Sequence, residues 1–347
     1  MKKLLVILLA LSMVFAFSAC GQEEVIENPE VEVETPEVEG EAEGEEEQEE
    51  VAKSGIDLTI LYEQDDSMIN NYSLLAVNPD APFVDADGNA VADVALNTEG
   101  ASALINWMLS EEAAELTANF GFEEYGEYLF YLKEDRPVSA VEIPAATEET
   151  KAIRLSTTTS VNDSGLLGYL LPFFEEEYGY TVEVFSAGTG KSIANAKAGN
   201  ADLILVHSKS QEEAFVADGY SYVLEGFEAE RLTYMYNYFV LVGPSADPAA
   251  VASAATVKDA FAAIADGEFA FVSRGDNSGT HTKEISLWPE DLGITAEMES
   301  VADYTGWYTF SNAGMGVCLT MAEEMGAYIL TDKATYLTFR ANDGVIE

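Results

Sequence analysis

The sequence predicts an α/β protein with a largely parallel sheet and helices on its faces. From residue 153 onward, short apolar segments alternate with segments whose apolar residues recur at helical spacing. This is the pattern of strands and helices that build a parallel sheet. In addition, three loops rich in hydroxyl residues and glycine each follow a predicted strand and precede a predicted helix. The part of the chain from residue 55 onward, about 290 residues long, fits two lobes or one large α/β domain.

The first 20 residues have the features of a secretory signal. Two lysines precede an apolar run from Leu4 to Phe17, and small residues lead into Cys20. The run is too short to span a membrane as a helix. We interpret residues 1–20 as a bacterial lipoprotein signal peptide with Cys20 as the lipidated residue. The alternative is an ordinary signal peptide with an incidental cysteine.

Residues 21–54 are predicted to form a disordered acidic tether. Half of the positions from 21 to 50 are glutamate, and such a segment cannot bury a core and extends through self-repulsion. The whole chain has a formal net charge of −47, which argues against binding to nucleic acid or to anionic lipid. The same charge repels small anions at long range, so an anion site here has to act through short-range hydrogen bonds.

Cysteine and histidine are scarce. Cys318 is the second cysteine, so no intrachain disulfide is expected once Cys20 carries lipid. The two histidines, His207 and His281, have no cysteine or carboxylate at metal-ligand spacing. The sequence therefore predicts no metal cation.

The secondary structure follows from apolar periodicity and from helix start and stop residues. Before the alternating region we expect strands at 56–62 and 72–77 and a helix over 98–120. Residues 134–150, rich in Pro and Glu, are typical of a linker. The later strands are expected at 153–158, 181–185, 201–206, 236–242, 269–272, 308–310 and 327–330, and the later helices at 164–178, 190–198, 210–217, 256–265, 279–287 and 314–325.

The first of the three loops, 156–164, begins with five consecutive hydroxyl residues. A helix that starts here directs its free amides and the positive end of its dipole at the loop. Such a terminus is a ready anion site made of neutral donors. The alternative is that these hydroxyls only cap the helix and face solvent.

The second loop, 186–192, is small and glycine-rich, which lets a ligand approach the backbone closely. Its Gly-Lys-Ser ending is that of a phosphate-binding loop, but Phe185 occupies the position of the first glycine of that motif. We therefore do not predict a nucleotide site. A tight turn for packing is the alternative.

The third loop, 273–281, contains Arg274, whose planar fork of donors suits an oxyanion. Ser278 and Thr280 add hydroxyls. The alternative is that Arg274 pairs with a carboxylate and that Asp276 caps a turn. The Arg-Gly-Asp tripeptide is common by chance and is not interpreted as an adhesion motif.

Together these segments resemble the tungstate-binding receptors of ABC importers. The resemblance covers nearly all of residues 153–340. It implies a two-lobed type II periplasmic-binding-protein (Venus flytrap) fold with the oxyanion in the interlobe cleft. The matching segments are 156–164, 186–190, 199–207, 236–244, 273–281 and 326–332.

The resemblance also implies which residues contact the anion and which partners the protein has. It implies tungstate as the ligand, with molybdate or another oxyanion as the alternative, no cofactor and no catalytic residue. It further implies a monomeric, extracytoplasmic receptor, held at the cell membrane only by its lipid anchor, that serves an ABC permease and its ATPase. The residues placed at the anion are Thr158, Thr159, Ser160, Ser186, Gly188, Arg274 and Ser278.

The order of segments departs from the family. Members finish with a strand pair, Asn-Tyr and Val-Asn-Pro stretches and a helix containing a tryptophan. Here similar residues, including Asn71-Tyr72, Val77-Asn78-Pro79 and Trp107, precede the first loop, and the chain stops at Glu347, where that finish would begin. We therefore expect a circularly permuted fold with 134–150 as the junction, which is tolerated when the original termini lie close together.

The permutation predicts how the solute-binding domain, 55–347, divides. Lobe 1 is expected to comprise approximately 73–133 and 150–242, and lobe 2 approximately 243–347 and 55–72. The alternative is that 55–133 forms an unrelated small domain.

Other functions are also considered. A surface-anchored transferase or hydrolase would need a nucleophile beside a base, and Ser278 with His281 is the available pair. A receptor for an organic solute would use an aromatic-lined cleft, which Tyr234, Tyr236 and Tyr238 could provide.

The protonation state of the anion distinguishes fully ionised oxyanions from phosphate. A fully ionised tetrahedral dianion needs only donors, whereas phosphate at neutral pH carries a proton and needs an acceptor. Asp163 and Asp276 lie within the loops, and we expect both to cap turns instead.

Overall fold

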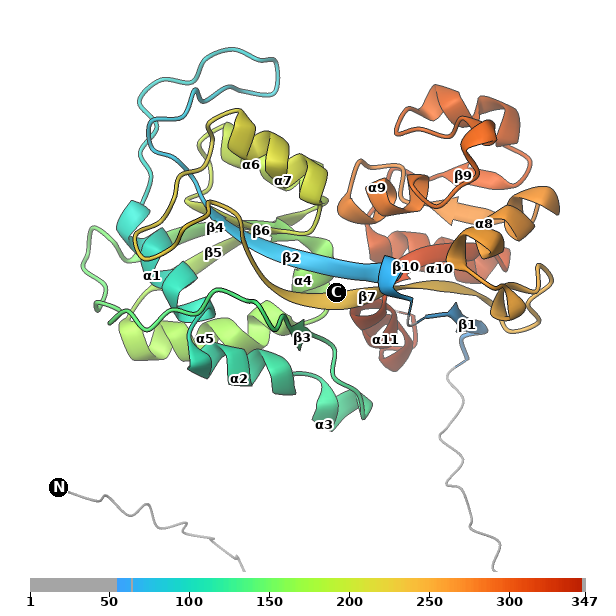
Figure 1. Cartoon of the computed structure of the whole chain (residues 1–347), viewed down its shortest axis with the longest axis horizontal. Helices are drawn as coiled ribbons and strands as arrows, with labels where there is room; N and C mark the ends of the chain where they lie inside the picture. The colour runs from blue at the N-terminus through green and yellow to red at the C-terminus, as the bar shows by residue number, and fades with distance from the viewer. Residues whose placement is uncertain (1–54, 64, 345–347) are drawn as a thin grey trace, which may run out of the picture. The chain divides into compact units, whose positions relative to one another are not determined.

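The computed structural model describes residues 55–63 and 65–344. They form one mixed sheet with strand order β5-β4-β6-β2-β7-β10-β8-β9, and β1 and β3 also pair with β7. We call the part built on β5, β4, β6 and β2 lobe 1 and the part built on β10, β8 and β9 lobe 2 (Figure 1). The predicted signal peptide, Cys20 and the predicted tether lie outside the described residues.

The long strand β7 (Leu232–Pro244) belongs to both lobes. Its first half pairs with β2 and β3, and its second half pairs with β10 and β1. The pairs β4–β5, β4–β6, β8–β9 and β8–β10 are parallel, whereas β2–β6 and every pair involving β7 are antiparallel. The other strands are β1 (Leu58–Tyr62), β2 (Ile69–Ala76), β3 (Tyr131–Leu132), β4 (Ala152–Thr158), β5 (Thr181–Ala187), β6 (Leu203–Val206), β8 (Phe271–Ser273), β9 (Tyr308–Phe310) and β10 (Tyr328–Asp332).

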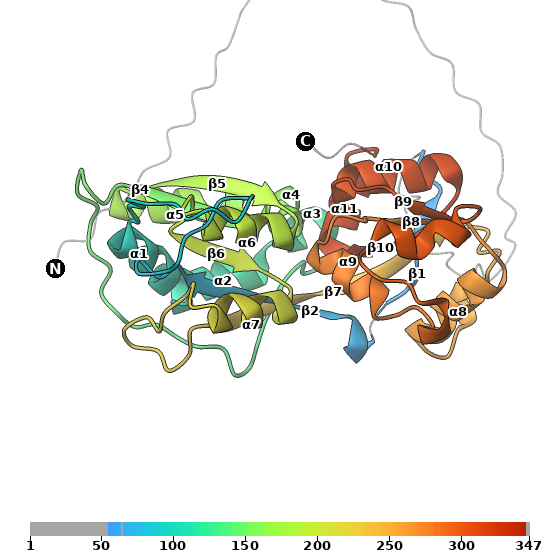
Figure 2. The same ribbon diagram turned by 90° about the horizontal axis from the view of Figure 1, so that it is seen from above.

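Helices cover both faces of the sheet in each lobe (Figure 2). In the described residues, no helix is long and apolar enough to cross a membrane. Short 3₁₀ helices occur at 66–68, 251–253, 290–292 and 298–304. The α-helices are α1 (Thr98–Met108), α2 (Glu111–Asn119), α3 (Phe122–Tyr125), α4 (Thr159–Asp163), α5 (Leu166–Tyr178), α6 (Thr189–Lys197), α7 (Lys209–Ala217), α8 (Val257–Asp266), α9 (Gly279–Ile285), α10 (Met315–Met325) and α11 (Lys333–Ala341).

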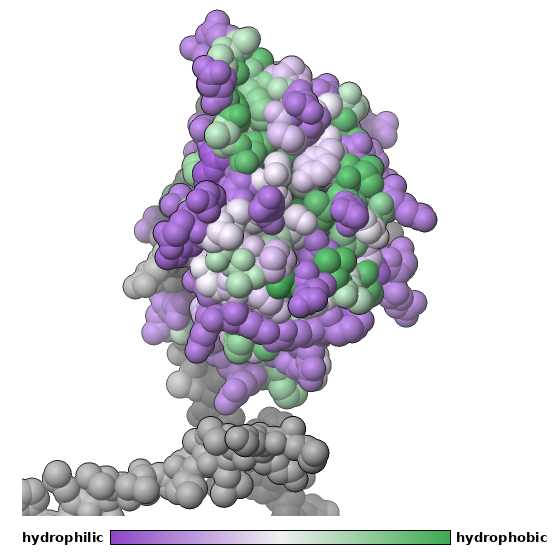
Figure 3. All heavy atoms as spheres, turned by 90° about the vertical axis from the view of Figure 1, so that its left-hand side faces the viewer, coloured by the Kyte–Doolittle hydropathy of each residue, from purple (hydrophilic) through white to green (hydrophobic). Residues whose placement is uncertain are grey.

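Separate apolar cores hold the helices to the sheet. In lobe 1, the largest core contains Trp107 of α1 and Phe174 of α5, whose ring centroids are 5.5 Å apart. A smaller core in the same lobe contains Ile193 of α6 and Phe215 of α7. At the end of lobe 1, the surface is largely hydrophilic with smaller hydrophobic groups between (Figure 3).

Two predicted helices differ from the structure: one is divided into two, and the other is preceded by an additional short helix. The helix expected over 98–120 breaks after Met108, because the Ser110 side chain accepts a hydrogen bond from the amide of Ala113 and starts a new helix. The helix expected at 164–178 is α5, and it is preceded by a further short helix, α4, which begins at Thr159 directly after β4. Gly165, with φ of 83°, then separates α4 from α5, a backbone conformation that glycine adopts at little cost.

Residues 55–133 are an integral part of the fold. β2 lies between β6 and β7 in the sheet, and β1 pairs with β7. A Cβ atom added to Gly344 would lie 3.6 Å from Cδ1 of Ile56, so the two ends of the described domain lie close together. The interpretation of 55–133 as an unrelated small domain is therefore wrong.

Asp202 also ties this first segment to lobe 1. Its buried carboxylate accepts hydrogen bonds from the backbone N–H of Arg154 (2.7 Å) and from that of Asn97 (2.8 Å), and it pairs with Nη2 of Arg154 (2.6 Å). Asn97 caps the start of α1. The Gly-Asn-Ala-Asp segment that ends in Asp202 therefore has a structural role at the opposite end of β4 from the first loop.

Candidate anion-binding site between the lobes

The three predicted loops meet where the lobes face each other. Nη1 of Arg274 donates a hydrogen bond to Oγ1 of Thr159 at 3.4 Å, which joins the third loop to the first. A Cβ atom added to Gly188 would lie 3.0 Å from Oδ2 of Asp276 and 3.0 Å from Cβ of Ser278, so the second loop lies against the third. All three loops follow the carboxyl ends of parallel strands, which is where binding sites of open α/β sheets form.

The first loop presents two hydrogen-bonded hydroxyl groups, one of which keeps a proton for a ligand. Thr158 and Ser160 are both buried, and their hydroxyl oxygens are 3.1 Å apart. The phenol of Tyr72 donates a hydrogen bond to Oγ of Ser160 at 3.0 Å. Because the Ser160 oxygen accepts the Tyr72 proton, the pair of Thr158 and Ser160 has two protons for one hydrogen bond between them, and the other proton is left for a ligand.

The second loop contains two buried hydroxyl groups without a partner in the described part of the chain. These are Oγ of Ser186 and Oγ1 of Thr189. Thr189 is fully buried and is the first residue of α6, after the N-cap residue Gly188. Leaving a buried hydroxyl unpaired costs about 1–3 kcal/mol, so the two atoms mark a place where a ligand would supply the missing partners.

Thr189 was not among the residues predicted from the sequence. Its position in the sequence could have indicated a role in the site, because Thr189 directly follows the predicted site residue Gly188 and begins the helix after the loop. What the sequence could not show is that its side chain is buried and unpaired.

In the third loop, Arg274 is 97% buried and its donors are fixed on two sides. Nε donates to the carbonyl of Ala313 at 2.9 Å, and Nη2 pairs with Oδ2 of Asp276 at 2.5 Å. The Asp276 carboxylate also accepts from the N–H of Ser278 at 3.1 Å. Asp276 therefore caps the turn, as predicted, and also orients the guanidinium group.

Ser278 is buried and caps α9 through a hydrogen bond from the N–H of His281 to its Oγ, at 3.2 Å. The Ser278 oxygen accepts, and its hydroxyl proton remains free for a ligand. Nδ1 of His281 accepts a hydrogen bond from the backbone of Asn277 at 3.1 Å. The imidazole is thus not placed as a base for Ser278, the nucleophile considered from the sequence.

Asp163 does not cap a turn, contrary to the prediction. It is the last residue of α4, and its carboxylate accepts a hydrogen bond from the side chain of Asn162 at 3.3 Å. Burial raises the pKa of Asp163, and the positive charge of Arg274 opposes that rise. The two loop carboxylates therefore differ in their pairing: Asp276 forms an ion pair with Arg274, whereas Asp163 forms none with a described residue.

A buried polar network supports the first loop from the strands that join the lobes. Asn70 of β2 donates to the Tyr72 phenol and to Oδ1 of Asn237 on β7, both at 2.9 Å. Asn237 in turn donates to Asp332 of β10 at 3.2 Å. Burial and the charge of Arg274 lower the pKa of His207 to about 3, so this ring is neutral and its Nδ1 donates to Asn70 (2.7 Å).

The described residues hold no group of three or more His, Cys, Asp or Glu side chains suited to a metal cation. The tyrosines considered for an organic solute pack against one another and against the sheet. The ring of Tyr236 stacks on that of Tyr131 at 5.4 Å and contacts Tyr238 at 5.7 Å, whereas Tyr234 lies in the core of lobe 1. The convergent polar groups of the three loops therefore form the strongest candidate site.

Two lobes joined by a shared strand, with polar loops meeting between them, define the class of periplasmic-binding-protein-like folds. The model of the PBP superfamily domain matches residues 144–346. The chain belongs to this family.

Individual relatives are also similar. The tungstate-binding protein TupA of Peptoclostridium acidaminophilum is 45% identical over 201 residues, 57% of this chain and 65% of that protein. A putative ABC transporter anion-binding protein of Haloferax volcanii is 42% identical over 193 residues, 56% of this chain and 52% of that protein. The matches thus span less than two thirds of these relatives.

Among solved structures, that of the tungstate ABC transporter from Geobacter sulfurreducens is 43% identical, with a TM-score of 0.45. The match covers 55% of this chain and 75% of that chain.

The close contact at Gly188 gives a test of the site geometry. Replacing Gly188 with Ala places a methyl group 3.0 Å from Asp276 and Ser278 of the opposite lobe. We expect the lobes to close less completely and the affinity for an oxyanion to fall by roughly tenfold, equivalent to about 1.4 kcal/mol. Isothermal titration calorimetry with tungstate measures the affinity.

Gly168→Ala is the matched control, because an added methyl group on α5 meets nothing within 4 Å. It should bind like the wild type. Equal affinities of the Gly188→Ala variant and the control would show that the second loop does not approach the third in the bound state.

Proposed function

We propose that this protein is an extracytoplasmic receptor that binds tungstate between its lobes and delivers it to an ABC importer. The observation that supports this most strongly is the pair of buried, unpartnered hydroxyl groups of Ser186 and Thr189, which lie in the loop that contacts the loop of the buried Arg274. The similarity to relatives named as tungstate-binding and anion-binding proteins supports the same ligand class.

The proposed ligand shell consists almost entirely of donors. Arg274 supplies the positive charge, through the part of its fork that points to Thr159. Backbone N–H groups at the starts of α4 and α6 add neutral donors, because the first amides of a helix have no partner within it. The hydroxyl and backbone donors proposed come from Thr158, Thr159, Ser160, Ser186, Gly188, Thr189 and Ser278.

This shell favours an anion that carries no proton. Asp276 is occupied by Arg274 and by the amide of Ser278, so it is a poor acceptor for a protonated ligand. Asp163, which has no cationic partner among the described residues, is the carboxylate of the loops that would have to accept such a proton. Tungstate and molybdate have four oxygens that only accept, whereas phosphate near neutral pH carries a proton that needs an acceptor. Molybdate remains the alternative ligand, because it shares the charge and shape of tungstate.

Lobe closure around the ligand is the proposed basis of delivery. The strands β2 and β7 join the lobes, and their buried side chains Asn70 and Asn237 are hydrogen-bonded to each other. A ligand that contacts loops of both lobes binds the closed form more tightly and shifts the population toward it. The closed, loaded receptor is then the form that an ABC permease and its ATPase would receive.

Lipid anchoring is part of the proposal. Residues 1–20 would direct export, Cys20 would carry the lipid, and 21–54 would hold the binding domain away from the membrane. Labelling of expressing cells with radioactive palmitate should mark the wild type, and the Cys20→Ser variant should lose the label. Persistent labelling of that variant would contradict the assignment of Cys20.

We also infer that the fold is circularly permuted relative to its family. The family model matches 144–346, yet β2, which precedes this region, lies in the middle of the sheet and pairs with β6 and β7. The proximity of Gly344 to Ile56 is what such a rearrangement requires.

The permutation predicts the behaviour of two shortened or rearranged chains. A fragment of residues 151–347 lacks β1, β2 and the helices around Trp107, so it should be insoluble or unable to bind. Joining residues 55–133 after Glu347 should restore a soluble binding protein, as judged by size-exclusion chromatography and calorimetry. A stable 151–347 fragment that binds tungstate would contradict the inference.

Arg274 provides the most direct test of the binding site. The Arg274→Ala variant should lose at least about 1.5–3 kcal/mol of binding free energy, which is the range for a charge-assisted hydrogen bond in a buried site. Arg274→Lys should also bind weakly, because an ammonium group cannot reproduce the planar fork. Calorimetry of ligand-stripped protein against tungstate measures both effects.

Arg340→Ala is the control for charge removal, since Arg340 is exposed on α11. Circular dichroism establishes that each variant is folded. Unchanged titration of the Arg274→Ala variant would remove Arg274 from the site.

A further inference from the structure

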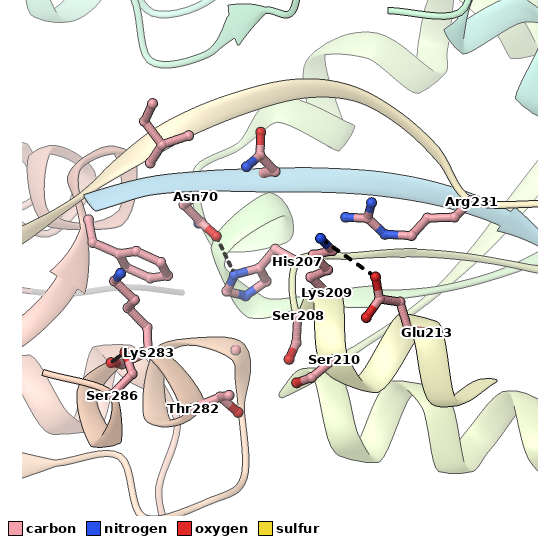
Figure 4. A pocket seen from close by; sticks show the side chains of 14 residues that line it. Asn70, His207, Ser208, Lys209, Ser210, Glu213, Arg231, Thr282, Lys283 and Ser286 are labelled. Atoms are coloured by element: carbon pink, nitrogen blue, oxygen red, sulfur yellow. Dashed lines mark hydrogen bonds and ion pairs between the residues drawn. The ribbon is translucent and has the colours of Figure 1, made fainter. Parts of the chain in front are cut away.

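A second polar cavity lies beside the proposed site and is lined by residues of both lobes. Its volume is about 450 Å³, and its walls come from β2, β7, α7, α9 and the segments next to them (Figure 4). Three of the thirteen Lys and Arg residues in the described chain line it, namely Lys209, Arg231 and Lys283, against the single carboxylate of Glu213. In a chain with a net charge of −47, this is a local concentration of positive charge.

The three cations differ in how far their charge is neutralised. Arg231 pairs with the buried carboxylate of Glu212, and Lys209 is 3.6 Å from Glu213 on the surface. Lys283 donates to the backbone carbonyl of Ser67. No ion pair within 4 Å between described residues contains Lys283. Burial lowers the pKa of Lys283 and the charge of Asp65 opposes that shift, so an anion in the cavity would compete with Asp65 for this cation.

An uncharged donor lines the same cavity. Ser208 is 95% buried, its Oγ has no partner among the described residues, and it precedes the first turn of the nine-residue helix α7 without capping it. From the opposite lobe, Thr282 and Ser286 line the cavity with hydroxyl oxygens whose protons are already used, because Thr282 donates to the carbonyl of Ser278 (3.0 Å) and Ser286 to that of Lys283 (2.6 Å). The unpaired Ser208 hydroxyl is the same kind of signal that marks Ser186 and Thr189 in the proposed site.

The cavity borders the proposed site at a contact between the lobes. His207 and Gly279 both line the cavity, and Gly279 directly follows the site residue Ser278. A Cβ atom added to Gly279 would lie 2.6 Å from Cε1 of His207, so backbone and ring are in close contact. Separation of the lobes would part Gly279 from His207 and connect the cavity to the site.

We propose that this cavity is an entry site, where a doubly charged tetrahedral oxyanion binds before it moves to the inner site and the lobes close. The inference rests on the proposed function and addresses how the anion reaches a strongly acidic protein. At 0.1 M salt, charges are screened beyond about 10 Å, so the last part of the approach depends on the local field. Lys209 on lobe 1 and Lys283 on lobe 2 supply an attractive local field on either side of the opening.

The test is the rate of tungstate association, measured by stopped-flow tryptophan fluorescence. The double variant Lys209→Ala/Lys283→Ala is compared with the wild type and with Lys151→Ala. The control removes one positive charge, as the single variant Lys283→Gln does, from an exposed position before β4, at the end of that strand opposite Thr158. Arg231 is left intact because its loss would leave Glu212 buried and unpaired.

At low ionic strength the association rate constant of the double variant should fall roughly three- to tenfold, within the range of electrostatic steering. The dissociation rate constant should stay within about twofold, and the difference should disappear at about 0.5 M salt, where screening is strong. The Lys151→Ala control should match the wild type throughout. The single variant Lys283→Gln, with a smaller change in side-chain volume, should show part of the same effect.

Two results would overturn the entry site. An unchanged association rate would show that the cations do not attract the ligand. A raised dissociation rate with an unchanged association rate would place them in the final complex instead. Failure of the wild type to bind tungstate or molybdate at all would refute the proposed function itself, which separates that outcome from these two.

Discussion

The arrangement of the site depends on one buried charge, the guanidinium group of Arg274. A buried cation is costly unless other groups compensate it. Here Asp276 pairs with Nη2 and the carbonyl of Ala313 accepts from Nε, while Nη1 reaches Thr159 of the other lobe. The same fork therefore fixes the third loop and contacts the first. A dianion bound at this point would complete the neutralisation that Asp276 alone begins, and it would hold the lobes together.

A chain of buried polar groups next to the site donates its hydrogen bonds in one direction, toward Ser160. The neutral ring of His207 donates to Asn70, Asn70 donates to Tyr72, and Tyr72 donates to Ser160. Each acceptor thus receives its proton from within the network, which leaves one proton of the Thr158 and Ser160 hydroxyl pair for a ligand. Because Asn70 and Asn237 lie on the strands that join the lobes, the network also links ligand contact to the hinge.

The proximity of two of the loops has a simple physical reason. Strands β4 and β5 are parallel neighbours, so the loops after 153–158 and 181–185 lie at the same edge of the sheet. Strand β8 lies in the other lobe, and the resemblance to a family was needed to predict that the loop after 269–272 meets them. The capping role of Asp276 was also correctly predicted, since an aspartate two residues before an amide commonly caps a turn. The resemblance to a family was needed to select individual residues within each loop.

Other features could not be read from the sequence. The burial of Thr189 and the raised pKa of Asp163 depend on contacts between segments distant in the chain. The position of β2 in the middle of the sheet depends on long-range pairing that apolar alternation does not encode. Helix α11 was missed because its first residues follow β10 without a break, with Asp332 acting as both the last strand residue and the N-cap.

The proposed site consists mainly of donors and should therefore select an oxyanion that carries no proton. Calorimetric titration of ligand-stripped protein with tungstate, molybdate, sulfate and phosphate at neutral pH, in two buffers of different ionisation enthalpy, tests this selectivity most directly. We predict that tungstate and molybdate bind at least about tenfold more tightly than phosphate, a difference of about 1.4 kcal/mol. Their binding should exchange no protons with the buffer. Phosphate binding as tight as that of tungstate would contradict this selectivity, because it would show that a carboxylate such as Asp163, which no described cation pairs, accepts the phosphate proton.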